Sequence, residues 1–327
     1  MKDRILELLR QESGYLSGQE MSTLLGVSRA AVWKAVEALR KEGYTIDSAP
    51  NRGYHLDAPT GRLSAREIAA RLDGHPWAEL VQVLDSVDST NNLAKTLAAQ
   101  GAPAGTVIVA DSQTGGRGRM GRSFVSPPGV GVYLSVILRP EAPPEELMHL
   151  TCAVAEVLCD GIEVASGLRP GIKWTNDLVS GGRKLCGILT ELSLEAESGH
   201  VQYAVVGAGV NCDQTLSDFP PEIRDMAGSL SMLTGKAVSR NTLAAEMIRA
   251  LSRLDGDLVE NRQEWMDRYR RDCVTIGRAV SVSRAGETRW GQAVDVDDRG
   301  ALLVDFGQGP EAVKSGEVSV RGMYGYV

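Results

Sequence analysis

The residues with the clearest capacity for chemistry lie in one short stretch, TGGRGRMGRSF, from Thr114 to Phe124. It combines glycines and arginines without an acidic residue: Gly115, Gly116, Gly118, Gly121, Arg117, Arg119 and Arg122. Glycine lets the backbone approach a ligand closely, and a guanidinium offers a planar set of donors that matches phosphate and carboxylate oxygens. The stretch is typical of a loop that grips a polyanion. The alternative is a flexible, solvated basic loop.

Polar side chains that suit a ligand or a metal accompany further predicted strands. Asn176 and Asp177 directly follow a short apolar strand and indicate either a turn or a ligand and metal contact. Lys184 opens the next strand, either as an edge charge or as a cation pointing into a site. Asn211 ends a strand that contains Gly207 and Gly209. Glycines inside a strand suggest that a ligand or another backbone approaches closely.

A neutral polar cluster lies where a predicted strand passes into a helix. Ser89, Thr90 and Asn91 either cap this helix or hydrogen-bond a neutral polar ligand near its N-terminus. The buried strand 106–110 delivers Gln113 into the glycine- and arginine-rich loop. The four histidines lie outside all of these motifs, so a Ser/His/Asp arrangement is not indicated.

The composition is that of a globular protein without a generic affinity for polyanions. The 327 residues are 43% hydrophobic and 24% charged, with a formal net charge of −7, so nucleic acid would need a local basic patch. No apolar run is long enough to cross a bilayer, and no membrane partner is expected. The five cysteines are scattered and form no CxxC pair, which predicts neither a disulfide framework nor a zinc site. We expect a cytoplasmic protein.

Residues 1–60 predict a winged helix-turn-helix domain. Ser17 and Glu20 form a capping-box pattern, Gly26 ends that helix, and a third helix runs to about Lys41. A predicted hairpin follows as the wing. The residues expected at DNA are Ser28, Arg29, Ala30, Trp33, Lys34 and Arg52. Eight basic and eight acidic residues cancel over 1–60, so a small helical domain for protein contacts is the alternative.

The rest of the chain predicts two further domains. Residues 61–270 alternate short strands with helices, including helices over 145–163 and 242–259, which gives an α+β domain with a mixed, mostly antiparallel sheet. Residues 271–327 carry alternating strand patterns and predict a small SH3-like β-barrel.

Four motifs that occur in order strongly resemble the bacterial biotin–protein ligases. They are DSTN at 88–91, QTGGRGRMGRSF at 113–124, KWTNDL at 173–178 with GRKLCGIL at 182–189, and GAGVN at 207–211. With the helix-turn-helix, nearly the whole chain resembles the bifunctional form, a biotin ligase and repressor of the biotin operon. Thr175 stands where the family usually has proline, and Met120 where some members have another arginine.

The resemblance implies a role for each matched residue. Biotin would contact Ser89, Thr90, Asn91, Gln113, Arg117, Gly118, Arg119 and Lys184. ATP would contact Arg117, Arg119, Arg122, Asn176, Asn211 and Arg321, and Asp177 would serve Mg²⁺. Lys184, Arg119 and Asp177 would be the catalytic residues. The chemistry fits, because an already ionised carboxylate attacking a phosphate needs charge cancellation and no protein nucleophile.

The resemblance also implies partners and regulation. The ligase would make biotinyl-5′-AMP from biotin and ATP and pass biotin to a lysine of a biotin carboxyl carrier protein of acetyl-CoA carboxylase. With biotinyl-5′-AMP as corepressor, a liganded homodimer would bind operator DNA. Three alternatives remain: a ligase without DNA binding, a ligand-sensing transcription factor without ligase activity, and a lipoate–protein ligase.

Overall fold

The computed structural model divides the chain into two compact units, Met1–Arg62 and Leu63–Val327, and each is described by itself. The structure describes residues 1–11, 14–41, 44, 46–49, 52–56, 61–195, 197, 199–284, 287–314 and 319–322. None of the helices within these ranges is long and apolar enough to cross a membrane.

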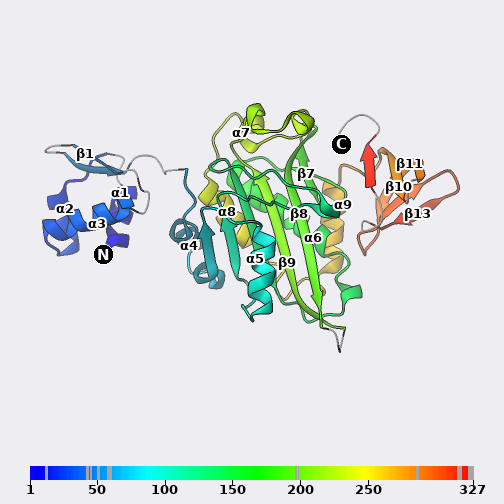
Figure 1. The fold of residues 1–327 in the computed structure, drawn as a ribbon, viewed down its shortest axis with the longest axis horizontal. Coiled ribbons are helices and arrows are strands. Elements are labelled where there is room, and N and C mark those ends of the chain that lie inside the picture. The colour runs from blue at the N-terminus through cyan, green and yellow to red at the C-terminus, as the bar shows by residue number, and fades with distance from the viewer. Residues whose placement is uncertain are drawn as a thin grey trace. The chain divides into compact units, whose positions relative to one another are not determined.

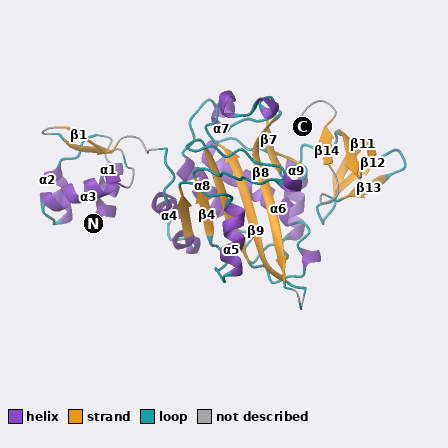
Figure 2. Ribbon diagram, in the orientation of Figure 1, coloured by secondary structure: helices purple, strands orange, loops and turns teal. Residues whose placement is uncertain are grey.

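The described residues of the first unit form three helices and a hairpin (Figures 1 and 2). They are α1 (Lys2–Gln11), α2 (Gly18–Leu25), α3 (Arg29–Lys41), β1 (Ile46–Ala49) and β2 (Gly53–Leu56). The Ser17–Glu20 capping box is present, and Gly26 ends α2 in the left-handed conformation that favours glycine. The predicted helix-turn-helix and its wing are therefore confirmed.

Helix α3 has one buried face and one exposed face. Val32, Val36 and Leu39 are fully buried in the core of this unit, at the spacing of one helical face. Ser28 precedes α3, and its hydroxyl accepts a hydrogen bond from the Ala31 amide at 3.2 Å. The wing strands pair antiparallel, with Ile46 opposite Leu56. The core thus fixes which side chains α3 turns outward.

A seven-stranded mixed sheet forms the centre of the second unit, in the order β3-β4-β5-β9-β8-β7-β6. Its strands are β3 (Val81–Leu84), β4 (Val107–Ala110), β5 (Gly131–Leu138), β6 (Gly171–Lys173), β7 (Asp177–Ser180), β8 (Arg183–Leu194) and β9 (Val201–Asn211). Only the β3–β4 pair is parallel within this sheet. The predicted mostly antiparallel sheet is confirmed.

Helices cover both faces of this sheet. The helices of the unit are α4 (Ala65–Leu72), α5 (Thr90–Ala99), α6 (Leu150–Ser166), α7 (Leu230–Thr234), α8 (Arg240–Ser252) and α9 (Arg262–Asp272). Ala94 and Ala98 of α5 pack on Ile108, Ile137 and Val205, while alternate strand residues face the core that contains α6 and α8. Short 3₁₀ turns connect several elements: η1 (Pro76–Leu80), η2 (Arg119–Gly121), η3 (Pro144–Glu146), η4 (Leu216–Asp218) and η5 (Pro221–Ile223).

Two predicted helix boundaries are wrong. The helix expected over 145–163 begins at Leu150, because Pro144–Glu146 forms a separate 3₁₀ turn. The helix expected over 242–259 spans Arg240–Ser252, where the Ser239 hydroxyl caps its start, and turns follow it. Local apolar spacing continues past both boundaries, so it did not reveal them.

The last described strands form a five-stranded antiparallel sheet, in the order β13-β12-β11-β10-β14. Its strands are β10 (Ala279–Arg284), β11 (Glu287–Val296), β12 (Leu302–Asp305), β13 (Pro310–Val313) and β14 (Ser319–Gly322). The predicted small antiparallel β domain is confirmed, but its described strands form an open sheet with β13 and β14 as edges, not a closed barrel. The Trp174 indole donates to the Gly300 carbonyl at 3.0 Å and ties this sheet to the central unit.

Candidate active site and candidate DNA-binding groove

A narrow pocket lies where α5, β8 and β9 meet the glycine- and arginine-rich loop. Ser89, Thr90, Asn91, Gln113, Arg117, Phe124, Gly187, Leu189, Gly207, Ala208 and Gly209 line it. Residues up to 120 positions apart in the sequence therefore share one cavity, and five of the residues expected at biotin are among them. The segment Thr114–Phe124 thus forms part of a pocket wall.

Thr90 and Gln113 form a hydrogen-bonded corner of this pocket. The Gln113 amide oxygen accepts from the Thr90 backbone amide at 2.9 Å and from its hydroxyl at 3.1 Å. The Gln113 amide nitrogen donates to the Ser126 hydroxyl at 2.9 Å. Within the described chain, Ser89 occupies the N-cap position of α5 without a capping hydrogen bond from its hydroxyl. Simple capping therefore does not account for Ser89.

The strand glycines of the pocket make room for side chains. A methyl group on Gly207 would overlap the Asn91 amide, and one on Gly209 would lie 2.6 Å from the Phe124 ring. At Gly187 an added methyl would lie 3.1 Å from Phe124 and 3.2 Å from the Lys184 ammonium. The close approach expected at Gly207 and Gly209 is thus made by side chains of α5 and of the loop.

Replacing Gly207 by alanine is expected to weaken both the fold and the pocket. The Asn91 side chain donates hydrogen bonds to Leu189 and Glu191, and it would have to break them to move away from an added methyl group. Overpacking of this kind costs about 1–3 kcal/mol in the free energy of unfolding. Urea unfolding and biotin titration measure the two effects, with Gly61→Ala as control because a methyl there meets nothing within 4 Å. Unchanged biotin affinity in Gly207→Ala would contradict the prediction.

The glycine- and arginine-rich loop is closed by its own backbone. The Gly118 amide donates to the Arg122 carbonyl at 2.7 Å, and the Phe124 amide donates to the Gly116 carbonyl at 2.9 Å. The Arg117 guanidinium donates to the Asn92 side chain at 2.9 Å. Arg122 is exposed. The loop therefore aims Arg117 at α5 and leaves Arg122 toward solvent.

Arg119, Asn176, Asp177 and Lys184 form a second polar cluster beside the pocket. Arg119 donates to the Asn176 side-chain oxygen at 3.0 Å, and the Asn176 amide nitrogen donates to the Ile188 carbonyl at 2.7 Å. The Lys184 ammonium pairs with the Asp177 carboxylate at 2.5 Å. Burial lowers the pKa of Arg119, while the charge of nearby Asp177 opposes that change. The guanidinium stays protonated, so two cations face one carboxylate here.

Asn211 and Arg321 are also predicted to contact the nucleotide. The buried Asn211 side chain donates to the carbonyls of Gly228 at 2.9 Å and Lys184 at 3.4 Å, and it accepts from Gln214 at 3.2 Å. Asn211 therefore ties the segment after β9 to the start of β8. The Arg321 backbone pairs with Ser281 in the C-terminal sheet, and its side chain lies outside the described residues.

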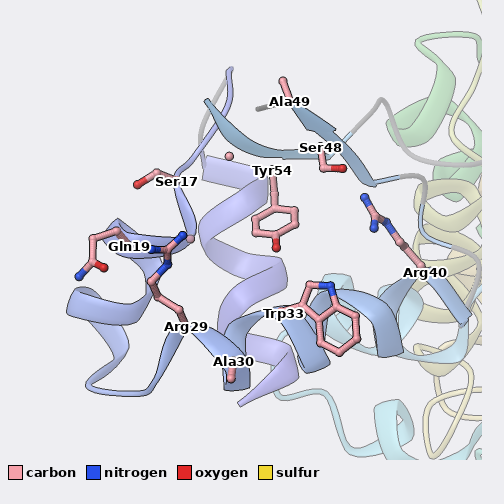
Figure 3. Close-up of a pocket in the computed structure, with 11 residues that line it drawn as sticks. Ser17, Gln19, Arg29, Ala30, Trp33, Arg40, Ser48, Ala49 and Tyr54 are labelled. Carbon is pink, nitrogen blue, oxygen red and sulfur yellow. The ribbon is translucent and has the colours of Figure 1, made fainter. Parts of the chain in front are cut away.

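The exposed side of the first unit contains a groove of about 920 Å³ (Figure 3). It is lined by Ser17, Gly18, Gln19, Arg29, Ala30, Trp33, Arg40, Ser48, Ala49, Gly53 and Tyr54. Trp33 is 54% exposed although it is a large apolar side chain. The predicted DNA residues Arg29, Ala30 and Trp33 thus share one groove between α3 and the wing.

The other residues of the groove region have structural partners. Arg40 donates to the Ile46 carbonyl at 2.6 and 2.9 Å and pairs with Glu37 at 2.7 Å, which joins α3 to the wing. Arg52 stacks over the Tyr15 ring at 4.3 Å. Ser28, just before α3, and Lys34, on α3, are exposed but do not line the groove.

Comparisons with known proteins match both units. The biotin/lipoate A/B protein ligase family matches residues 83–211, an HTH domain matches 2–55, and the biotin protein ligase C-terminal domain matches 275–321. The bifunctional ligase/repressor BirA of Bacillus spizizenii is 35% identical over 98% of both chains. The chain belongs to the bifunctional biotin–protein ligase family.

Further relatives of this biotin–protein ligase agree. The biotin–[acetyl-CoA-carboxylase] ligase of Mycobacterium tuberculosis is 33% identical over 75% of this chain and 90% of its own. The Aquifex aeolicus biotin protein ligase, solved in complex with biotin and ATP, has a TM-score of 0.64 at 28% identity and covers 74% of this chain and 98% of its own.

Several residues of the ligase site were not predicted from sequence. Phe124 belongs to the recognised motif, yet only the structure shows its ring against Gly209 and Gly187. Asn92 holds Arg117, and Glu191 with Lys95 holds Asn91. A helical spacing of four residues between Asn91 and Lys95 was the available signal.

Proposed function

We propose that this biotin–protein ligase activates biotin with ATP, transfers it to a carrier-protein lysine, and represses transcription when it carries biotinyl-5′-AMP. The proposal rests on the position of two cations at a narrow polar pocket. Arg117 lines the pocket, and Lys184 lies against its wall at Gly187. The uncharged polar side chains of the lining suit a neutral polar ligand body, and the cations suit carboxylate and phosphate oxygens.

In the first step a biotin carboxylate oxygen attacks the α-phosphorus of ATP, and the bond to pyrophosphate breaks. The products are biotinyl-5′-AMP and pyrophosphate. The carboxylate is already ionised, so no protein base is required. Lys184 and Arg119 offset the negative charge that both reactants bring together, and Arg117 orients the biotin side. Arg122 and Arg321 are assigned to ATP on the resemblance.

Asp177 is proposed to hold Mg²⁺ together with nucleotide phosphates. Clusters of three or more His, Cys, Asp or Glu side chains that could enclose a metal are absent from the residues that the structure describes. The site therefore fits Mg²⁺ only in its usual phosphate-bound form, with one carboxylate from the protein. Mg²⁺ would neutralise phosphate charge. Asn176 and Asn211 would contribute by fixing Arg119 and the start of β8.

In the second step a lysine amine of the acceptor attacks the acyl carbon of biotinyl-5′-AMP, and AMP leaves. The amine must be neutral, and Asp177 is close enough to Lys184 to act in the same site. Asp177→Asn is expected to slow adenylate formation. Transfer from preformed biotinyl-5′-AMP, measured separately on a biotin carboxyl carrier domain, tests a role in deprotonation. Unchanged transfer would exclude that role.

Pyrophosphate release with Mg-ATP and biotin, lipoate or neither tests the ligase activity. We expect release with biotin alone. The family match covers biotin and lipoate ligases together, whereas the curated relatives favour biotin. Release with lipoate would move the assignment to lipoate ligation. Failure with both ligands would favour a ligand-sensing transcription factor.

Repression is proposed to need a liganded homodimer. Ordering a loop costs about 1–2 kcal/mol of backbone entropy per residue, which contacts of biotinyl-5′-AMP with residues 112–124 and the segment after Asn211 would offset. A dimer could then engage two operator half-sites through α3. Sedimentation with and without biotin plus ATP is the test, and equal dimerisation in both would refute it. DNA selected from a random duplex pool by the liganded protein would separate a repressor from a ligase without DNA binding.

A further inference from the structure

A series of hydrogen-bonded polar side chains runs from the surface of α5 into the pocket. The Lys95 ammonium pairs with one Glu191 carboxylate oxygen at 2.8 Å. The other Glu191 oxygen accepts from the Asn91 amide nitrogen at 2.8 Å. Asn91 and Lys95 lie on α5, and Glu191 lies on β8. These contacts therefore join two elements that form the pocket wall.

Glu191 decides which way the buried Asn91 amide points. An ionised carboxylate accepts hydrogen bonds and cannot donate them. Partial burial opposes ionisation of Glu191, but hydrogen bonds from Lys95 and Asn91 lower its pKa below the usual value. The Leu189 carbonyl, 3.2 Å from the same Asn91 nitrogen, is also only an acceptor. Both neighbours therefore require the NH₂ group of Asn91 on their side.

The Asn91 oxygen then sets the direction of the next hydrogen bonds. It lies 2.6 Å from the buried Ser135 hydroxyl, which must donate its hydrogen to this oxygen. The Ser135 hydroxyl is also placed to donate to the Thr90 oxygen at 2.8 Å, but a hydroxyl has a single hydrogen and the Asn91 oxygen is the nearer acceptor. The Thr90 hydroxyl itself donates to the Gln113 amide oxygen at 3.1 Å.

Thr90 consequently presents lone pairs to the pocket. Its hydrogen is directed to Gln113, and because Ser135 gives its hydrogen to Asn91, the Thr90 oxygen keeps its acceptor capacity for a ligand. An acceptor at this position suits a ligand that carries N–H donors. The ureido ring of biotin has two N–H groups, whereas the dithiolane ring of lipoate has none.

We propose that Glu191, held by Lys95, is a positioning residue for biotin: by orienting Asn91 it directs the Ser135 hydrogen to Asn91 and so leaves the Thr90 oxygen open to an N–H donor of biotin. This inference rests on the proposed function, since it takes biotin as the ligand. It assigns a role in biotin affinity to an ion pair that itself lies outside the pocket lining.

The variant Glu191→Gln reverses the orientation of the Asn91 amide if Lys95 is present. Lys95 only donates, so it attracts the oxygen of the new amide and turns the amide nitrogen toward Asn91. Asn91 must then flip, which places its oxygen against the Leu189 carbonyl and its nitrogen against Ser135. The Ser135 hydrogen then turns to the Thr90 oxygen and occupies the acceptor that biotin would use. In the double variant Glu191→Gln with Lys95→Met, the glutamine is free to turn its oxygen back to Asn91. The second substitution should therefore rescue the first.

Calorimetric titration with biotin in the absence of ATP tests the rescue. We expect Glu191→Gln to weaken biotin binding about 10-fold or more, in line with the cost of unsatisfied buried polar groups. The double variant is expected to recover most of that loss. Glu197→Gln, an exposed change in the turn after β8, serves as the matched control. In pyrophosphate release, the KM for biotin should rise while kcat and the KM for ATP stay near wild type.

The outcomes separate this inference from the proposed function. Wild-type protein that binds no biotin would overturn the proposed function itself. Wild-type binding with equal losses in the single and double variants would overturn the positioning inference alone, because a purely structural ion pair predicts no rescue. Wild-type affinity in Glu191→Gln would overturn it as well. Circular dichroism and urea unfolding check that each variant is folded, and the double variant keeps the test valid if the single variant is not.

Discussion

Replacing Lys184 by glutamine is expected to lower biotin-dependent pyrophosphate release about 100- to 1,000-fold, as the loss of one transition-state donor does in other enzymes. Lys184 brings a full positive charge to the pocket wall beside Gly187, where the biotin carboxylate and the α-phosphate would meet. Glutamine keeps polar donors but removes the charge. The substitution also removes the ammonium group that pairs with Asp177 at 2.5 Å.

Single-turnover measurements at saturating biotin and ATP distinguish this effect from weaker binding. We expect the rate constant of adenylate formation to fall, with a smaller change in biotin affinity measured without ATP. Lys236→Gln is the matched control, because Lys236 is exposed in the turn after α7. A rate within a few-fold of wild type in Lys184→Gln would show that Arg119 and Mg²⁺ suffice, and would remove Lys184 from the catalytic set.

Replacing Arg29 by alanine is expected to weaken specific operator binding about 10-fold or more, since an arginine that reads a base contributes about 1–3 kcal/mol of discrimination. Arg29 is the first residue of α3, is exposed, and lines the groove between α3 and the wing. The N-terminal residues of a recognition helix are the ones that contact base edges.

Fluorescence anisotropy with a selected operator duplex and a scrambled duplex, at one fixed salt concentration, measures this effect. Loss of affinity for the operator with little change for the scrambled duplex would identify Arg29 as a base-reading residue. An equal loss for both would make it a phosphate contact. Arg4→Ala, an exposed change on α1, is the control, and ligase activity should be unaffected by either substitution. Wild-type operator affinity in Arg29→Ala would exclude the groove as the reading surface.

Because the charges of the first unit nearly cancel, DNA binding by this unit depends on where its individual cations lie. Residues 1–60 carry equal numbers of acidic and basic side chains, so general attraction to DNA is weak. Arg40 is committed to the Ile46 carbonyl and Glu37, and Arg52 stacks on Tyr15. Arg29 and Lys34 are thus the cations on α3 best placed for specific and nonspecific contacts, respectively.

The sequence alone determined the elements whose signals are local. The capping box at Ser17 and Glu20, the left-handed glycine at Gly26 and the apolar face of α3 act within a few residues, so they were predictable and are present. The family motifs likewise identified the segments that meet at the pocket. Their chemistry follows from residue types: glycine permits close approach, and arginine and lysine offset anionic charge.

Only the tertiary structure decided how those segments use their side chains. Phe124 lies against Gly187 and Gly209, and Glu191 fixes Asn91 from 100 residues away. Asn211, which the motifs assign to the nucleotide, donates to the carbonyls of Gly228 and Lys184. These contacts depend on the register of β8 against β9 and on the packing of α5 over the sheet. Neither leaves a periodic pattern in sequence, because each joins residues whose separation along the chain is set by intervening elements.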